Sequence, residues 1–172
     1  RVQLTRRPPH EAKTNDQQQQ DYLALFDAVL ATTGTHVMFF DDDVVLCDGI
    51  GTTLHKALAI PNLTLAHFGR GGSGILVPMT KIRHMKAFVA SHRDNVDVAM
   101  LQWALRHEKG CALRPRHVQM RHMGGTSSID RRPRGGGLRH HWPLEDQCGA
   151  PANNYDFQAM SEIYDTFFWS EY

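Results

Sequence analysis

The stretch His36-Val37-Met38-Phe39-Phe40-Asp41-Asp42-Asp43 decides the fold that we expect for this chain. Its first five residues form a short apolar run rich in β-formers, which predicts a buried strand. The strand ends in three adjacent carboxylates. Keeping them ionised beside a buried strand is costly unless a cation or ordered hydrogen-bond donors compensate them. The boundary therefore predicts a ligand site at the carboxyl end of a strand.

The spacing of the three carboxylates divides them between two faces. Alternate residues of a strand point to the same side, so Asp41 and Asp43 converge on one ligand while Asp42 faces away. Hard oxygen ligands at this spacing suit Mg²⁺ or Mn²⁺ held together with a diphosphate. The alternative is a solvated acidic turn after the strand. The apolar residues Val37–Phe40, which lead directly into the triplet, favour the ligand site over this alternative.

Periodicity on both sides of this stretch predicts alternating helices and strands. Helical spacing places Tyr22, Leu25, Phe26, Val29 and Leu30 on one helix face before a stop at Gly34. We also expect helices over 52–59, after Thr80 with Ile82, Met85 and Val89 buried, and from Asp94 or Asn95 to Gly110 with Val98, Leu101 and Leu105 buried. Strands are expected over 63–68, 75–77 and 117–121. This order favours an α/β domain, where ligands usually bind at the carboxyl ends of strands.

Composition limits the class of protein. The 172 residues, 41% hydrophobic and 22% charged, fit one globular domain. A net charge of +1 argues neither for a nucleic-acid binder nor for an acidic interaction tail, and no nucleic-acid partner is expected. No apolar run approaches the roughly 18–20 residues that a membrane helix needs. Cys47, Cys111 and Cys148 leave two states open, one disulfide with a free thiol or three thiols. Asn62-Leu63-Thr64 is an N-glycosylation sequon, a triplet that also arises by chance.

Taken in order, several segments resemble the N-acetylglucosaminyltransferase IV family and, more distantly, the GPI-glycan GalNAc transferases. They are the helix 20–26, the connector 32–35, the strand into Asp41-Asp42-Asp43-Val44-Val45, the glycine-bearing loop 68–74, the helix start 95–101, and the ending 113–128 with its His-x-Gly-x-x-Ser-Ser pattern. Asp41 stands where the family usually has Glu. The resemblance covers roughly residues 17–129 and implies a GT-A-like, Rossmann-like mixed sheet with flanking helices.

The resemblance implies an inverting, metal-dependent sugar transfer. The donor would be a UDP-sugar carrying GlcNAc or GalNAc, the acceptor a glycan, glycoprotein or glycolipid, and the cofactor Mn²⁺ or Mg²⁺. Asp43 is the implied direct metal ligand, joined by Asp41 and His122, and Asp41 would also meet the donor ribose or a metal-bound water. The implied donor-binding residues are Asp41, Asp42, Gly71, Gly72, Ser73, Gly74 and Ser127.

Asp97 is the implied catalytic base, which would take the proton of the acceptor hydroxyl. Its alternative role is to cap a helix or to stabilise the dipole of a first helical turn. The alternative for His122 is an ordinary core or surface histidine, one of eleven in the chain. His117 is expected to be structural.

Two other classes of function stay open. Haloacid-dehalogenase-like phosphatases also end an apolar strand in Asp-x-Asp, with the first Asp as nucleophile, here Asp41. These phosphatases also need a Ser or Thr after a later strand, followed by a Lys and then by an acidic pair. Thr126-Ser127 would supply the hydroxyl group, but no Lys and acidic pair follow it in that order. The basic, glycine-bearing stretch Arg131–Trp142 is typical of an RNA-binding module or of a solvated segment. A non-catalytic pseudoenzyme is the remaining alternative.

The expected organisation has three parts. Residues 1–16 are a connector, residues 17–129 are the C-terminal part of a GT-A domain, and residues 130–172 are a loosely packed tail with an aromatic helix near 157–169. The chain starts at Arg1, so we expect a fragment whose nucleotide-binding half and membrane anchor lie upstream. The resemblance implies the Golgi lumen as location.

Overall fold

The computed structural model describes residues 15–41, 44–69, 74–92, 95–107, 111–115, 117–122 and residue 148. These residues form helices around a mixed sheet, which confirms the expected α/β class. The helices are α1 (Asn15–Leu30), α2 (Ile50–Leu58), the 3-10 helix η1 (Met79–Lys81), α3 (Ile82–Ser91) and α4 (Val96–His107). The strands are β1 (His36–Phe39), β2 (Val44–Leu46), β3 (Leu63–His67), β4 (Ile75–Pro78), β5 (Cys111–Leu113) and β6 (Met120–His122).

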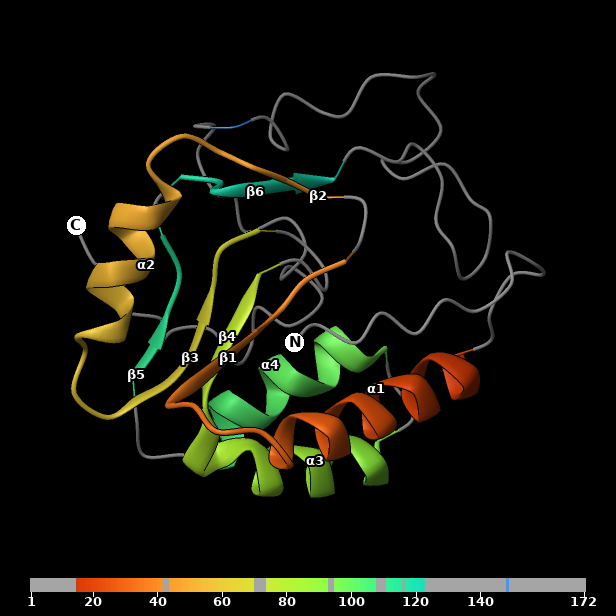
Figure 1. The fold of residues 1–172 in the computed structure, drawn as a ribbon. Coiled ribbons are helices and arrows are strands. Elements are labelled where there is room, and N and C mark those ends of the chain that lie inside the picture. The colour runs from red at the N-terminus through yellow and green to blue at the C-terminus, as the bar shows by residue number, and fades with distance from the viewer. Residues whose placement is uncertain are drawn as a thin grey trace, which may run out of the picture.

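The strands form two sheets. The larger has the order β1-β4-β3-β5, in which β4 runs antiparallel to both of its neighbours while β3 and β5 are parallel. β2 and β6 form a separate antiparallel pair beyond the carboxyl end of β1. Helices α1, α3 and α4 lie on one face of the larger sheet and α2 lies on the other (Figure 1). The sheet therefore has a hydrophobic core on each side.

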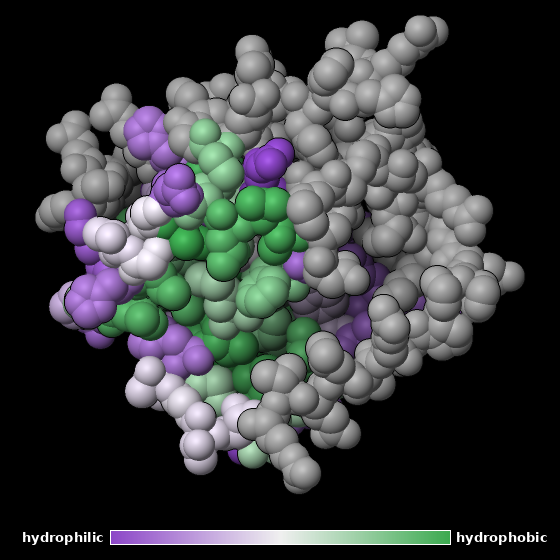
Figure 2. Space-filling view, turned by 45° about the horizontal axis from the view of Figure 1, so that its top comes forward, coloured by the Kyte–Doolittle hydropathy of each residue, from purple (hydrophilic) through white to green (hydrophobic). Residues whose placement is uncertain are grey.

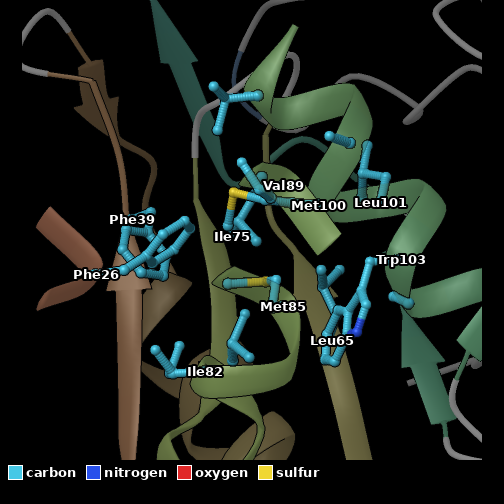
Figure 3. Packing of buried hydrophobic residues seen from close by; sticks show 14 residues of the cluster. Phe26, Phe39, Leu65, Ile75, Ile82, Met85, Val89, Met100, Leu101 and Trp103 are labelled. Carbon is cyan, nitrogen blue, oxygen red and sulfur yellow. The ribbon is translucent and has the colours of Figure 1, made fainter. Parts of the chain in front are cut away.

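Strand alternation assigns side chains to these two cores. Phe39 and Val77 belong to a buried cluster with side chains of α1, α3 and α4. Within it Phe39 lies beside Phe26, and Trp103 lies beside Leu65 (Figure 3). Met38 and Leu76, the neighbours of Phe39 and Val77 along the strands, pack instead with α2. Each strand of the centre is thus covered on both faces, which explains why β3 is buried along its whole length and β4 along all but its last residue.

Helix α1 is fastened to α3 by polar contacts as well as by apolar ones. The amide of Gln19 donates to the backbone carbonyls of Val89, at 2.6 Å, and of His92. Lys86 pairs with Asp27 across the same interface. These contacts fix α1 over the sheet, where the ring of Phe26 meets that of Phe39 edge-on at a centroid distance of 5.2 Å.

Several expectations about the helices need correction. Leu25 is 45% exposed, because α1 turns Tyr22, Phe26 and Val29 toward the core and leaves Leu25 outside that arc. In α4 the fully buried positions include Met100 and Trp103, whereas Val98 and Leu105 are half-buried. A helix that packs on both a sheet and other helices buries more than one narrow stripe of side chains. Counting apolar residues at helical spacing therefore identified only part of the buried face of α4. α1 also begins at Asn15, inside the expected connector.

The short strands were harder to foresee. β2 and β5 have three residues each, too few to show a period of two, and neither was expected. The last strand begins at Met120 rather than at residue 117. The expected helix end at Gly110 and the expected helix near 157–169 lie outside the described residues.

A disulfide joins Cys47, just after β2, to Cys148, so the alternative with three thiols is excluded.

Of the residues that the structure describes, none belong to a helix long and apolar enough to cross a bilayer. Hydrophobic side chains gather on one face of the molecule (Figure 2). Large apolar residues with substantial exposure include Phe40, Leu46 and Leu58.

Candidate functional site

The candidate site lies at the edge of the sheet where β1 ends. Asp41 is half-buried there, two residues beyond the buried Phe39 that ends β1. The side chain of Phe39 lies on the face that α1 and α4 cover. Asp42 and Asp43, the other two members of the acidic triplet, lie outside the described residues.

The small sheet brings the last expected metal ligand back to this edge. Val44, which follows Asp43 in the chain, is the register partner of His122, and Val45 is the partner of Arg121. Two segments almost eighty positions apart in the sequence therefore meet beside the acidic triplet. The backbone of His122 is placed by this pairing, while its side chain is outside the description.

Backbone hydrogen bonds connect the small sheet to the base of the glycine-bearing loop. The N–H of Cys47 donates to the carbonyl of Gln119 at 3.0 Å, and the N–H of Gln119 donates to that of Phe68 at 2.9 Å. The N–H of Phe68 in turn donates to the carbonyl of Gly74 at 2.9 Å. The two ends of the loop are thus held together and tied to the strand that follows the acidic triplet.

Gly74 is required where it stands. Its φ is +74°, a left-handed conformation that residues with a Cβ avoid. A Cβ there would lie 2.6 Å from the Sδ of Met120 and 3.0 Å from the Cβ of Phe68. The loop can therefore approach β6 this closely only because Gly74 has no side chain. Gly71, Gly72 and Ser73, the other expected donor-binding residues of this loop, are outside the described part of the chain.

Asp97 lies inside the first turn of α4 and is half-buried. The helix begins at Val96, and the N–H of Ala99 donates to the carbonyl of Asn95 at 2.9 Å. Asn95 therefore occupies the capping position, so Asp97 is not the cap residue. Its carboxylate still benefits from the positive end of the helix dipole.

Tyr22 of α1, a residue that sequence reasoning treated as core, is affected by the charges of both carboxylates. Its ring centroid is 6.4 Å from that of Phe39 and 6.4 Å from that of Phe26. Burial raises the pKa of its phenol well above the usual value, and the charges of Asp41 and then Asp97 raise it further. Both carboxylates therefore act on one hydroxyl group, although they come from different elements.

The apolar spacing of α1 concealed this polar role of Tyr22. A tyrosine on the buried face of a helix needs a partner for its hydroxyl, and that requirement was the available signal.

The charges of Asp41 and Asp97 thus both reach Tyr22, and the pairing of β2 with β6 brings the backbone of His122 to the residue after Asp43. Ser127 lies outside the described residues, as does all of the expected tail except Cys148. Within the described ranges, no three His, Cys, Asp or Glu side chains gather as a metal site. The expected ligand set includes Asp43 and the side chain of His122, which are outside those ranges.

Comparison of the chain with protein families, with curated proteins and with solved structures finds no match.

Proposed function

We propose that this chain carries the C-terminal part of a GT-A glycosyltransferase domain. The enzyme transfers a sugar, GlcNAc or GalNAc, from a UDP-sugar to a hydroxyl of a glycan acceptor, with inversion. The observation that supports this proposal is that the charges of Asp41 and Asp97, which come from different elements, both raise the pKa of Tyr22. A sugar transfer needs a carboxylate on the donor side and a base on the acceptor side, within one site.

The donor set at the end of β1 is chemically suited to a divalent cation. Asp43, Asp41 and His122 would hold it, because carboxylate oxygens with one imidazole suit Mn²⁺. The pairing of Val44 with His122 supports this grouping. Mn²⁺, when bound, offsets the charge that builds on the leaving diphosphate.

The role of Asp97 follows from its place in α4. A carboxylate in a first helical turn is stabilised in its ionised form, which is the form that accepts a proton. It would take the proton of the acceptor hydroxyl as that oxygen attacks the anomeric carbon. Gly74 and the loop that it closes would let backbone amides approach the sugar, because the loop carries no bulky side chains at its glycines.

The disulfide supports a secretory location for this activity. Cys47–Cys148 is a bond of the kind that persists in oxidising compartments and is rare where thiols are kept reduced. A Golgi lumen location, implied by the family resemblance, is part of the proposal.

Calorimetric titration of UDP into the protein, with and without Mn²⁺, tests the proposal. We expect binding that needs Mn²⁺, that Asp43→Ala abolishes and that Asp48→Ala leaves intact, since Asp48 is an exposed carboxylate in the turn after β2. Unchanged UDP affinity in Asp43→Ala would remove the metal assignment.

The same protein preparation separates the alternatives. Hydrolysis of p-nitrophenyl phosphate that is lost in Asp41→Asn would favour the phosphatase. RNA affinity that falls steeply with salt would favour the binding module, because such binding releases counterions. Neither activity is expected of a glycosyltransferase.

A further inference from the structure

The only Asn-x-Ser/Thr triplet of the chain, Asn62-Leu63-Thr64, crosses the boundary between an exposed turn and the strand β3. Asn62 is exposed and has a φ of 58°, a left-handed conformation that asparagine adopts more readily than most residues. The folded protein therefore has room at Asn62 for a bulky, solvated group of the kind that N-glycosylation adds.

The other two residues of the triplet are buried in the folded protein. Leu63 is 2% exposed and Thr64 is 0% exposed. The Oγ1 of Thr64 accepts a hydrogen bond from the Nζ of Lys81 at 3.3 Å. Glycosylation requires Ser or Thr at the third position, so the modifying enzyme must reach this hydroxyl as well as the amide of Asn62. The folded chain presents the amide and hides the hydroxyl.

Release of Thr64 requires the centre of the larger sheet to open. β3 pairs with β4 on one side and with β5 on the other, and all five of its residues are buried (Figure 1). A strand held by two neighbours and by a core on each face opens only when most of the domain unfolds. The hydroxyl is therefore accessible in the unfolded chain and inaccessible in the native one.

We propose that Asn62 is an N-glycosylation site that accepts its oligosaccharide only before β3 joins the sheet. The Nδ2 of Asn62 forms a bond to the anomeric carbon of a lipid-linked oligosaccharide. The bond from that carbon to the lipid diphosphate breaks, the diphosphate leaves with the electron pair, and a base of the transferase takes one amide proton. The inference rests on the secretory location within the proposed function, and it needs neither UDP binding nor sugar transfer by this chain.

The fold leaves room for such a glycan away from the candidate site. β1 and β3 both run antiparallel to β4, so they point in the same direction. Asn62 precedes the amino end of β3, whereas the candidate site follows the carboxyl end of β1. The two therefore lie at opposite ends of the larger sheet, and a glycan on Asn62 leaves the candidate site open.

The first test offers the full chain to the same transferase in two states. One sample, fused to a signal peptide, is translated in the presence of microsomes. The other is the folded, unglycosylated chain, incubated with detergent-solubilised microsomes and their lipid-linked donor. Mass spectrometry should find one glycan, on Asn62, in the first sample and at least about 10-fold less in the second, because the native state hides the hydroxyl. Equal modification of the two samples would overturn the proposal, and so would an unmodified translated chain.

The second test changes how often the native chain opens. Leu65→Ala truncates a side chain of β3 that is 0% exposed, whereas Leu25→Ala, the matched control, truncates one of α1 that is 45% exposed. Starting from folded protein, Leu65→Ala should be modified at least about 10-fold faster than the wild type, because loss of a buried leucine raises the unfolded fraction. Leu25→Ala should match the wild type.

A milder variant covers the case in which Leu65→Ala does not fold. Ile82→Val changes the same buried cluster, and we expect its folded form to be modified about 2-fold to 10-fold faster than the wild type. Equal rates for all of these proteins would show that the transferase reaches Thr64 without unfolding, which would overturn the proposal. A wild type that binds no UDP would remove the proposed sugar transfer and leave both of these tests unaffected.

Discussion

Val44 and His122 are register partners in the antiparallel pair of β2 and β6. The residue after the acidic triplet therefore lies opposite a histidine from the far end of the described chain. Neighbouring strands lie about 4.8 Å apart, so the pairing fixes the backbone of His122 beside that of Val44, the residue after the acidic triplet that follows β1. The first prediction follows from this relationship.

We expect His122→Ala to weaken Mn²⁺-dependent UDP binding by at least about 10-fold, because removal of a metal ligand costs no less than removal of its supporting residues. His117→Ala is the matched control, since His117 is exposed and precedes β6. Calorimetry of both variants measures the difference. Equal affinities for the two variants would show that His122 is an ordinary strand residue.

Gly74→Ala should destabilise the fold by about 2–4 kcal/mol, combining a left-handed backbone with overpacking against Met120 and Phe68. Two other glycines separate these causes. Gly49 has a φ of +82° with open space around its Cβ position, so its Ala variant should lose only about 1–2 kcal/mol. Gly51, in α2 with open space, should gain about 0.5–1 kcal/mol as Ala. Urea unfolding ranks the three, and an equal loss at Gly74 and Gly49 would contradict the close contact with Met120.

The stability of the protein should fall at alkaline pH through Tyr22. Below its ordinary pKa of about 10 the phenol is protonated in both the folded and the unfolded chain. Above pH 10 the unfolded chain ionises this group while the folded protein, with its raised pKa, retains the proton. The unfolded state is then favoured, by up to about 1.4 kcal/mol per pH unit.

Tyr22→Phe removes this group, so its unfolding free energy should fall less steeply above pH 10 than that of the wild type. Asp97→Asn should lower the pKa of the phenol, because it removes one of the two charges that oppose its ionisation. Absorbance near the phenolate band, recorded during an alkaline titration, follows the ionisation directly. An unchanged titration in Asp97→Asn would separate Asp97 from Tyr22.

Loss of the Cys47–Cys148 disulfide should cost about 4–5 kcal/mol, because the bond closes a loop over a sequence separation of 101. We expect Cys148→Ser and the reduced wild type to unfold at the same lower urea concentration. Alkylation without reduction should label Cys111, and peptide mapping should recover Cys47 joined to Cys148. Labelling of all three cysteines in the untreated protein would contradict the link.

Asn62 should carry a glycan when the chain is expressed through a secretory pathway. It is exposed, with a φ of 58° in the turn before β3, whereas Thr64 of the same sequon is buried and accepts from the Nζ of Lys81 at 3.3 Å. Asn62→Gly should remove the glycan without loss of stability, because glycine favours this backbone conformation. Thr64→Ser should keep the glycan. Mass spectrometry before and after glycosidase treatment measures both, and an unmodified wild type would contradict the expectation.

Much of the fold could be predicted from local patterns. The apolar run into Asp41 is β1, and the spacing of Ile82, Met85 and Val89 is the buried face of α3. These two predictions were confirmed because the burial of an element produces a recognisable apolar pattern among neighbouring residues of the sequence. β2 and β5 could not be predicted in this way, because three residues carry no period and their pairing depends on remote strands. For the site, the carboxylates were foreseeable from their unusual density, and Tyr22 was not, because its apolar spacing matched a core residue.

By itself, the sequence determined the α/β class, the boundary between β1 and its acidic end, and the residue types available for chemistry there, since each depends on neighbours along the chain. Tertiary structure alone decided which distant groups meet. It set Asp41 and Asp97 within electrostatic range of Tyr22, placed the backbone of His122 opposite Val44, and joined Cys47 to Cys148. The physical reason is that these encounters follow from how helices and strands pack against a shared core, and packing partners leave no trace in local spacing.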